Sequence, residues 1–430
     1  MNERPLIQKS WNKNIKQLDI VYPNKYFGGV YCLAPLIFYN LVNNKNDWIC
    51  NRVFLDKGKL NSNLIGFTLQ YELDMKNVLE LLKKNNVGED KILFAGGPCV
   101  NKNYLPDVFD FFVFGAVEKV LNQILDLYTE DKKEFLGKIS KLEGVYVPGL
   151  SKQITYARLE NLDNVEYPLY QPLPEQLDET FVFGNSFLLE IERGCPFGCK
   201  FCSIKSVYDQ VQHRSIESLK EIIDRGIAIN QRKKVIIYSP SFTHPKRKEL
   251  LAYLLEKGLE FSIPSLRVEL VDEELLELVK KGGQRTLTVA PESNERLRFE
   301  VTKQTKDEDF VNFAKLASKV GFKKIKYYFM VGLPNTTEQD LIETVELVKK
   351  LKDAFTGKTY VSVNPFVPKA NTAWENKTFN KKEVKNQIKF LKKELGKLNI
   401  DAKFSSVSTA EKVYSSSSSN NSSEDSGTNI

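Results

Sequence analysis

Three cysteines lie within eight residues near the middle of the chain, at Cys195, Cys199 and Cys202. The apolar stretch SFLLEIERG precedes them and predicts a buried strand, so the cysteine loop follows the end of a strand. Gly194 and Gly198 permit the tight backbone path that three thiolates need in order to converge on one centre. Soft thiolate donors select zinc or an iron–sulfur cluster over hard cations. The spacing therefore predicts a metal-binding loop.

Zinc and an iron–sulfur cluster make different demands on such a loop. Structural zinc usually has four protein ligands supplied as two pairs, whereas this loop offers three thiolates, with His213 as a possible fourth ligand. A 4Fe–4S cluster held by three cysteines leaves one iron open for chemistry. Six cysteines in 430 residues, with no secretory signal, favour metal or catalytic use over disulfides.

The Cys-x3-Cys-x2-Cys spacing, with the aromatic Phe201 directly before the last cysteine, resembles the signature of the radical S-adenosylmethionine (radical SAM) superfamily. The resemblance implies that Cys195, Cys199 and Cys202 bind a 4Fe–4S cluster and that Phe201 lies beside the cofactors. It also implies that S-adenosylmethionine (SAM) chelates the open iron. One electron then cleaves SAM to methionine and a 5′-deoxyadenosyl radical. The electron donor would be a protein such as flavodoxin or ferredoxin.

Strand and helix patterns alternate after the cysteine loop. Six βα units of this kind make the partial (β/α)6 TIM-type barrel that the superfamily uses. Barrel sites are assembled at the carboxyl ends of the strands, so functional residues are expected there. The expected strands cover 186–192, 235–242, 260–269, 284–293, 323–334 and 359–368.

Several strand ends resemble superfamily segments that bind SAM. In APESNERL, Glu292 and Ser293 match the segment that binds the ribose, and Lys303 matches a basic position that meets the methionine carboxylate. Gly332, in MVGLP, matches the region that packs against adenine. Arg267 is a candidate for anchoring an anionic group of SAM or of the substrate. Two alternatives are a helix-capping role for Glu292 and a solvated surface position for Lys303.

Two departures from the family pattern concern the same loops. Asn294 stands where the family often has glycine, and asparagine tolerates the left-handed conformation expected there. The usual Gly-Gly-Glu after the second strand is replaced by YSPSF at 238–242. That motif acts through backbone carbonyls that face the methionine amine, so the function can survive the replacement.

Residues 1–130 alternate short apolar strands with helices, which predicts a parallel, Rossmann-like sheet. YPNKYFGG, the AGGP turn and Gly115 with Glu118 resemble the cobalamin-binding-like (B12-binding-like) domain that precedes the barrel in one subgroup. The only histidines of the chain are His213 and His244, so the Asp-x-His-x-x-Gly motif is absent. Histidine-ligated cobalamin is excluded, while cobalamin held without a protein ligand remains possible.

The fold class is thus α/β, with a Rossmann-like domain at 1–130, a surface connector at 131–184 and the barrel with a C-terminal helix at 185–404. The serine-rich residues 405–430 are expected to be disordered, because they have too little apolar content to form a core. A formal net charge of +7 permits nucleic-acid binding but does not require it. No stretch predicts a membrane span, and a cytoplasmic location is expected.

The predicted function is that of a radical SAM enzyme that acts on an unknown substrate, either a small molecule or RNA. One alternative is an RNA methylthiotransferase-like radical SAM enzyme with a second cluster on Cys32, Cys50 and Cys99. The pattern around these three cysteines favours buried structural positions instead. Another alternative is a non-catalytic zinc-binding protein.

Overall fold

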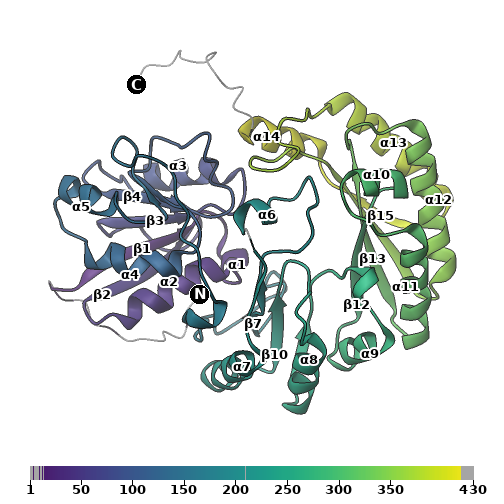
Figure 1. Cartoon of the computed structure of the whole chain (residues 1–430), viewed down its shortest axis with the longest axis horizontal. Helices are drawn as coiled ribbons and strands as arrows, with labels where there is room; N and C mark the ends of the chain where they lie inside the picture. The colour runs from purple at the N-terminus through teal and green to yellow at the C-terminus, as the bar shows by residue number, and fades with distance from the viewer. Residues whose placement is uncertain (1–2, 4–8, 10–11, 13, 209, 418–430) are drawn as a thin grey trace. The chain divides into compact units, whose positions relative to one another are not determined.

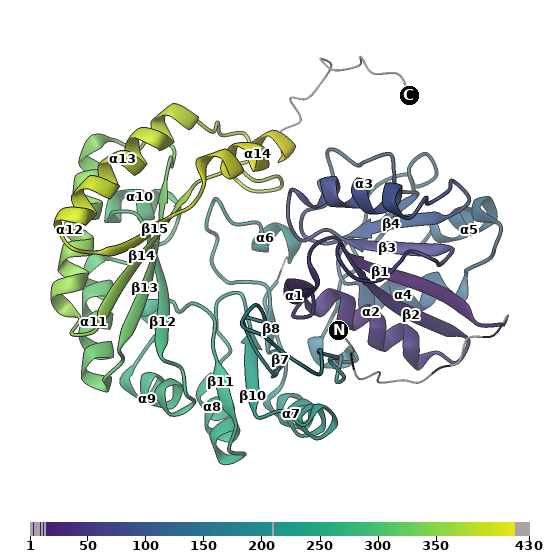
Figure 2. The same ribbon diagram turned by 180° about the vertical axis from the view of Figure 1, so that it is seen from behind.

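The computed structural model describes residues 3, 9, 12, 14–208 and 210–417. They form two compact units, which Figures 1 and 2 show from opposite sides. The first unit is Met1–Leu189 with Gln212–Ile236, and the second is Glu190–Val211 with Ile237–Ile430.

The first unit is built on a six-stranded sheet of order β2-β1-β3-β4-β5-β6. The first five strands of this order run parallel, and only β5 and β6 pair antiparallel. This confirms the predicted Rossmann-like sheet. The strands are β1 Lys16–Tyr22, β2 Trp48–Phe54, β3 Leu64–Thr68, β4 Ile92–Gly96, β5 Phe111–Val113 and β6 Val145–Tyr146.

Each face of this sheet has its own apolar core, because alternate strand residues point to opposite faces. Leu18 and Ile20 pack in one core with residues of the helices α2, α4 and α5, whereas Val21 packs in the other with residues of α3. The helices are α1 Tyr26–Gly29, α2 Leu33–Asn44, α3 Asp74–Lys84, α4 Val117–Asp126 and α5 Lys132–Ile139.

The prediction of a surface connector is wrong for the first part of 131–184. Phe135 and Ile139 of α5 are fully buried in the core beneath the sheet, and β6 adds a strand to the sheet edge. The short strand and the charged helix carried few apolar residues in sequence, so their pattern resembled a connector. Three buried side chains complete the same core after α5: Val145, Val147 and Ala157.

All six predicted barrel strands are present. Three of them form a sheet of order β11-β10-β7. The other three join β15 in a four-stranded sheet of order β12-β13-β14-β15, and all neighbours in this second sheet are parallel. The strand β15, Asp401–Phe404, was not predicted, because its four residues alternate without a strong apolar run. The others are β7 Ser186–Glu190, β10 Lys234–Tyr238, β11 Glu260–Ser262, β12 Thr286–Glu292, β13 Lys324–Val331 and β14 Lys358–Pro365.

Helices separate these strands along the chain, as the βα pattern predicts. α11, α12 and α13 lie along one face of the sheet β12–β15 (Figures 1 and 2). In β13 every second residue is buried, and the residues between them face the opposite side. The helices are α6 Ile204–Val207, α7 Ile216–Asn230, α8 Arg247–Glu256, α9 Glu273–Lys281, α10 Glu295–Glu300, α11 Asp307–Val320, α12 Glu338–Ala354 and α13 Lys381–Lys397.

The prediction of disorder from residue 405 is wrong for the residues up to 417. Val407–Ser417 forms the helix α14, in which Ala410 and Val413 are buried. Tyr414 contacts the ring of Phe379 with 5.8 Å between the centroids. These apolar residues, spaced three and four apart, give the helix a packing face that the adjoining serine run obscures. The remaining residues, 418–430, lie outside the described part of the chain.

No helix among the described residues is both long enough and apolar enough to cross a membrane.

A core substitution tests the placement of α5. Phe135→Ala should lower the free energy of unfolding by about 3–5 kcal/mol, because it leaves a cavity in a fully buried position. Urea unfolding followed by circular dichroism measures the change. Lys133→Ala, an exposed change in the same helix, is the control. Equal stability of the two variants would mean that α5 is a surface connector after all.

Candidate functional site

The cysteine loop turns sharply at Gly194, which directly follows the short strand β8, Glu192–Arg193. Gly194 has a φ of +80°, and a Cβ atom there would lie 2.5 Å from the carbonyl oxygen of Gln210. Only glycine fits this position without strain. Gly198 is different, because a Cβ atom would meet only the Lys205 side chain at 3.6 Å. The sequence-based requirement for glycine therefore holds at Gly194 but not at Gly198.

Backbone hydrogen bonds attach the loop to segments far along the chain. The Lys200 amide donates to the carbonyl of Val301 at 3.2 Å, and the Trp374 amide donates to the carbonyl of Lys200 at 3.2 Å. The Thr302 hydroxyl donates to the carbonyl of Gly198. These contacts fix the cysteine loop against the end of α10 and against the segment that follows β14.

Phe201, the aromatic residue of the loop, packs among apolar residues from α10 and from segments that follow two strands. Phe201 and Met330 are partly buried against one cluster. Its members come from α10 and from the segments that follow β13 and β14: Leu297, Val301, Leu333, Phe366 and Trp374.

The three loop cysteines are reduced and partly exposed. Burial raises the pKa of the Cys199 thiol, while the positive charges of Lys303 and Arg267 act in the opposite direction. Burial likewise raises the pKa of Cys202, and the neighbouring Cys195 adds to the increase. Lys303 and Arg267 thus lie close enough to favour the ionised form of the Cys199 thiol.

This donor set fits an iron–sulfur cluster, because three thiols in one short loop face compensating cations. Among the described residues, no three His, Cys, Asp or Glu side chains are already gathered as a metal-binding group.

Glu292 and Lys303, both predicted site residues, form a buried ion pair. Lys303 Nζ lies 3.1 Å from Glu292 Oε1 and also donates to the carbonyl of Ala290. Lys303 is only 6% exposed, so the surface-lysine alternative is wrong. Glu292 does not cap α10, because the side chain of Asn294 accepts the capping hydrogen bond from the Leu297 amide.

The left-handed residue of this segment is Glu292 and not Asn294. Glu292 has a φ of +68°, at a bulge in the pairing of β12 with β13, whereas Asn294 has an extended φ of −60°. Asn294 serves as the helix cap, a role in which asparagine is among the preferred residues. Non-glycine residues rarely adopt positive φ, so the backbone at Glu292 is held there by its surroundings.

Arg298 supplies much of that restraint, and the sequence did not single it out. Its fully buried guanidinium donates to the carbonyls of Pro291 and Ser293, on either side of Glu292, at 2.8 Å each. It also donates to the carbonyl of Thr305 at 2.8 Å and to Asp307 Oδ1 at 2.7 Å. A single side chain thus fixes both Glu292 and the segment that carries Lys303.

Asp340 connects the Glu292–Ser293 segment with the turn that follows β13. It accepts hydrogen bonds from Asn294 Nδ2 at 2.9 Å and from the Arg296 guanidinium, and it forms a capping box with Thr337. Burial alone would raise the pKa of Asp340. The bonds from Arg296, Thr337 and Asn294 outweigh this effect and hold the pKa well below its usual range. The pattern Thr337-x-x-Asp340 is the signal that could have revealed this residue.

Ser293 is buried, and its hydroxyl lies 3.4 Å from that of Thr344 in α12. Gly332 has a φ of +76°, and its amide donates to Gln387 Oε1 at 2.7 Å. A Cβ atom at Gly332 would lie 2.5 Å from Val384. Both predicted residues thus lie at strand ends, where neighbouring helices hold them.

Arg267 lies beside the cysteine loop, immediately before a short 3-10 turn. Its guanidinium stacks over the ring of Phe197 at 3.8 Å from the centroid and donates to Glu269 at 2.7 Å. One carboxylate already partners this arginine, so any further anion would share it.

Glu192, another residue that the sequence did not reveal, ties the loop that replaces Gly-Gly-Glu to the strand before the cysteines. This carboxylate is almost fully buried and accepts hydrogen bonds from the Thr243 amide at 2.9 Å and from the Ser239 hydroxyl. The 238–242 loop therefore takes a fixed path without the usual glycines.

The other cysteines occupy structural positions. Burial raises the pKa of the Cys32 thiol to about 12 and raises that of Cys50 well above its usual value. Cys50 lies within β2, Cys32 directly precedes α2, and Cys99 follows β4. His213, the possible zinc ligand, lies on the short strand β9, Gln212–His213, and belongs to the first unit, whereas the cysteine loop belongs to the second.

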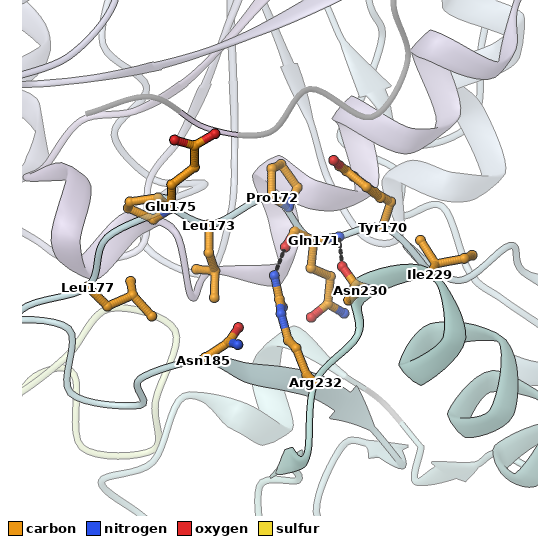
Figure 3. A pocket seen from close by; sticks show the side chains of 11 residues that line it. Tyr170, Gln171, Pro172, Leu173, Glu175, Leu177, Asn185, Ile229, Asn230 and Arg232 are labelled. Atoms are coloured by element: carbon orange, nitrogen blue, oxygen red, sulfur yellow. Dashed lines mark hydrogen bonds between the residues drawn. The ribbon is translucent and has the colours of Figure 1, made fainter.

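A pocket of about 530 Å³ lies in the first unit, and none of its lining residues is a predicted site residue (Figure 3). Its wall includes Arg232, whose guanidinium donates to the carbonyls of Ser186 and Gln171. Asn230 accepts a hydrogen bond from the Gln171 amide at 3.0 Å. These bonds join the 170–175 segment to the end of α7, which is a structural role.

Comparisons with known proteins indicate the family of this chain. Residues 189–348 match the family described as Radical SAM superfamily, and residues 59–148 match the one described as Radical SAM proteins, N-terminal. An uncharacterized protein of Methanocaldococcus jannaschii is 36% identical over 404 residues, which cover 89% of this chain and 85% of that protein. A putative methylthiotransferase of the same organism is 24% identical over 332 residues, with 72% and 69% coverage.

Among solved structures, the chain is similar to TsrM from Kitasatospora setae, a radical S-adenosylmethionine methyltransferase with cobalamin and a [4Fe-4S] cluster bound. The TM-score is 0.60 at 14% identity, over 81% of this chain and 72% of that one. At this identity the likeness shows the fold alone. It confirms the predicted class, a cobalamin-binding-like domain followed by a partial TIM-type barrel.

Asp340 offers a test of the site framework through pH. Its pKa is lower in the folded state than in the unfolded chain, where it is about 3.9. Its contribution to stability is therefore complete above that value and is lost as the pH falls toward the folded pKa. Asp340→Asn should lower the free energy of unfolding at pH 7 by about 2 kcal/mol. Below pH 5, the free energy of unfolding of the variant should fall less steeply with decreasing pH than that of the wild type.

Urea unfolding of the metal-free chain between pH 3 and pH 7 measures this dependence. Asp353→Asn, an exposed change in the same helix, is the control for the loss of a helix carboxylate. An Asp340→Asn variant with the wild-type decline would contradict the assignment of the depressed pKa.

Proposed function

We propose that this chain, which belongs to the radical SAM superfamily, cleaves SAM reductively with its cysteine loop and the adjoining strand ends. The resulting 5′-deoxyadenosyl radical then acts on a bound substrate. The observation that carries the proposal is the buried Glu292–Lys303 pair, whose charges act on the loop thiols. A structural metal loop has no need of a strained, buried carboxylate and lysine beside it.

In this proposal Cys195, Cys199 and Cys202 hold a 4Fe–4S cluster. When bound, the cluster supplies the electron for SAM cleavage, and a reduced flavodoxin or ferredoxin replenishes it. Arg267 and Lys303 offset the negative charge of the ligating thiolates. The backbone hydrogen bonds of Lys200 with Val301 and Trp374 hold the loop in place.

The strand ends would hold SAM. Glu292 is the proposed ribose ligand, supported by its rigid backbone, and Lys303 is the proposed partner of the methionine carboxylate. Ser293 acts by shaping the segment, since its hydroxyl already lies beside Thr344. Gly332 is the proposed neighbour of adenine through the family resemblance, and its lack of a side chain makes room for Val384 of α13. Arg267 is the less favoured anion partner, because Glu269 already neutralises it.

The first unit supports a second cofactor proposal, namely cobalamin held without a histidine ligand. The support is its likeness in fold to the cobalamin-bound TsrM structure and the absence of histidine before position 213. Optical spectra of cobalamin-loaded protein typical of histidine coordination would contradict this proposal.

Methylthio transfer is the second candidate reaction, supported by the 24% identical putative methylthiotransferase. It would require a second cluster, yet the three remaining cysteines come from separate elements, since Cys32 precedes α2, Cys50 lies within β2 and Cys99 follows β4. A purely structural zinc protein is the remaining alternative. Metal content distinguishes all three.

Anaerobic reconstitution should yield about four irons per chain and, with dithionite and SAM, 5′-deoxyadenosine. Cys202→Ala should abolish product formation and lower the iron content, because the cluster loses one of three ligands. Cys99→Ala is the matched control and should retain both. Iron analysis and chromatographic detection of 5′-deoxyadenosine provide the two readouts.

The alternatives predict different results. About eight irons per chain, with half lost in Cys99→Ala, would favour a methylthiotransferase. A colourless, zinc-containing protein that forms no 5′-deoxyadenosine would exclude the enzymatic proposal.

Arg298 provides a second prediction, since it positions the proposed SAM ligands without touching SAM itself. Arg298→Lys keeps the charge but cannot reproduce the four hydrogen bonds of the guanidinium. The Kd for SAM of the cluster-loaded enzyme, measured by equilibrium dialysis, should rise roughly tenfold. Arg225→Lys, an exposed change, is the control, and an unchanged Kd in Arg298→Lys would refute the positioning role.

A further inference from the structure

One face of the strand β13 carries polar side chains where a barrel interior usually carries branched apolar ones. Ile325, Tyr327, Phe329 and Val331 are buried, and the residues between them face the other way. Those half-buried residues are Lys324, Lys326, Tyr328 and Met330. On β14 the half-buried Tyr360 stands beside Lys326 in the parallel register. We call Lys326, Tyr328 and Tyr360 the Lys326 face.

The Lys326 face gathers three polar groups that lack a protein acceptor. Lys326 Nζ lies 4.5 Å from the ring centroid of Tyr328 and 5.8 Å from that of Tyr360. Within the described ranges, neither this ammonium nor either tyrosine hydroxyl donates a hydrogen bond to a protein group. The two rings attract the cation through their faces but leave all three donors available.

No negative charge of the protein neutralises Lys326 within the described residues. Its register neighbours are Thr288 on β12 and Tyr360 on β14, and both are uncharged. Asp401, the neighbour of Tyr360 on β15, lies 2.8 Å from the ammonium of Lys358. The charge of Lys326 is therefore open to an anion from outside the protein.

The same face leads to the cysteine loop. Met330 lies on this side of β13, four residues after Lys326. It packs with Phe201 of the loop against one apolar cluster. At about 3.3 Å per residue, Tyr328 lies about 7 Å and Lys326 about 13 Å along the strand from Met330. A molecule anchored at Lys326 can thus extend toward the cysteine loop along one strand.

We propose that the Lys326 face binds an anionic group, a carboxylate or a phosphate, of the substrate. The inference rests on the proposed function, because it takes the cysteine loop as the place where the radical forms. Lys326 supplies the charge, and the hydroxyls of Tyr328 and Tyr360 supply directed hydrogen bonds to the anionic oxygens. The substrate class is then an acidic molecule long enough to reach from Lys326 toward Met330, about 13 Å along the strand.

Equilibrium dialysis with two radiolabelled probes tests this site on the cluster-loaded enzyme. Inorganic phosphate and acetate are each titrated in the presence of saturating SAM, which occupies the cofactor positions. We expect one probe to bind saturably, and its identity distinguishes a phosphate from a carboxylate substrate. Lys326→Gln should weaken that binding roughly tenfold, and Tyr328→Phe should weaken it a few-fold.

The matched control is Lys392→Gln, which removes an exposed lysine that also lies over an aromatic ring, that of Phe404 at 5.3 Å. It should bind the probe as the wild type does. If neither probe binds saturably, or if Lys326→Gln binds as tightly as the wild type, the inference is overturned.

Formation of 5′-deoxyadenosine by the same wild-type preparation separates this inference from the proposed function. Product formation without anion binding overturns only the Lys326 face. Absence of product refutes the proposed function, and the Lys326 face then no longer stands as a substrate site.

Discussion

The buried guanidinium of Arg298 is the interaction on which the site depends. A fully buried arginine is costly unless its donors and its charge are satisfied, and here three carbonyls and the carboxylate of Asp307 satisfy them. Two of these carbonyls flank Glu292, so the same bonds that stabilise Arg298 hold Glu292 at a positive φ. The third belongs to Thr305, two residues beyond Lys303. The segments that carry Glu292 and Lys303 thus share one buried support, Arg298.

The supports of the site reach beyond one strand end. Asp340 joins the Asn294 cap to the start of α12, and the Val301 carbonyl receives the amide of Lys200 in the cysteine loop. Because the Glu292 segment and the loop are fixed to the two opposite ends of the short helix α10, movement of one would disturb the other. In the proposed function, a cluster site and a nucleoside site act on one SAM molecule, and such shared support would keep them aligned.

The sequence predicted the elements of the fold well because their signals are local. Alternating strand and helix patterns identified the parallel sheet of the first unit and all six barrel strands. The errors lie where local pattern is weak and tertiary packing decides. Phe135 enters the core from a charged helix, and α14 packs through Ala410 and Val413 beside a serine run. Neither segment has enough apolar periodicity to reveal its packing.

The site shows the same division. The spacing of the cysteines and the family resemblance predicted the cysteine loop, Glu292 and Lys303, and in the structure the last two residues form an ion pair. Arg298 and Glu192 were not identified, since their roles come from carbonyls and hydroxyls that folding brings to them. The left-handed residue was assigned to Asn294, although the structure has it at Glu292. Propensity ranks asparagine above glutamate for that conformation, and the restraint from Arg298 overrides the preference.

The alternation of β13 explains how one strand can serve both the framework and the chemistry. Its buried residues pack against the helices and contribute stability, so the opposite residues are free to vary without loss of the fold. On that free side the polarity changes along the strand, from Lys326 through Tyr328 to the apolar Met330 beside Phe201. A radical needs an apolar, water-excluding environment, whereas an anionic group needs donors and charge. The order of side chains on β13 therefore orients an acidic substrate with its anionic end away from the cysteine loop.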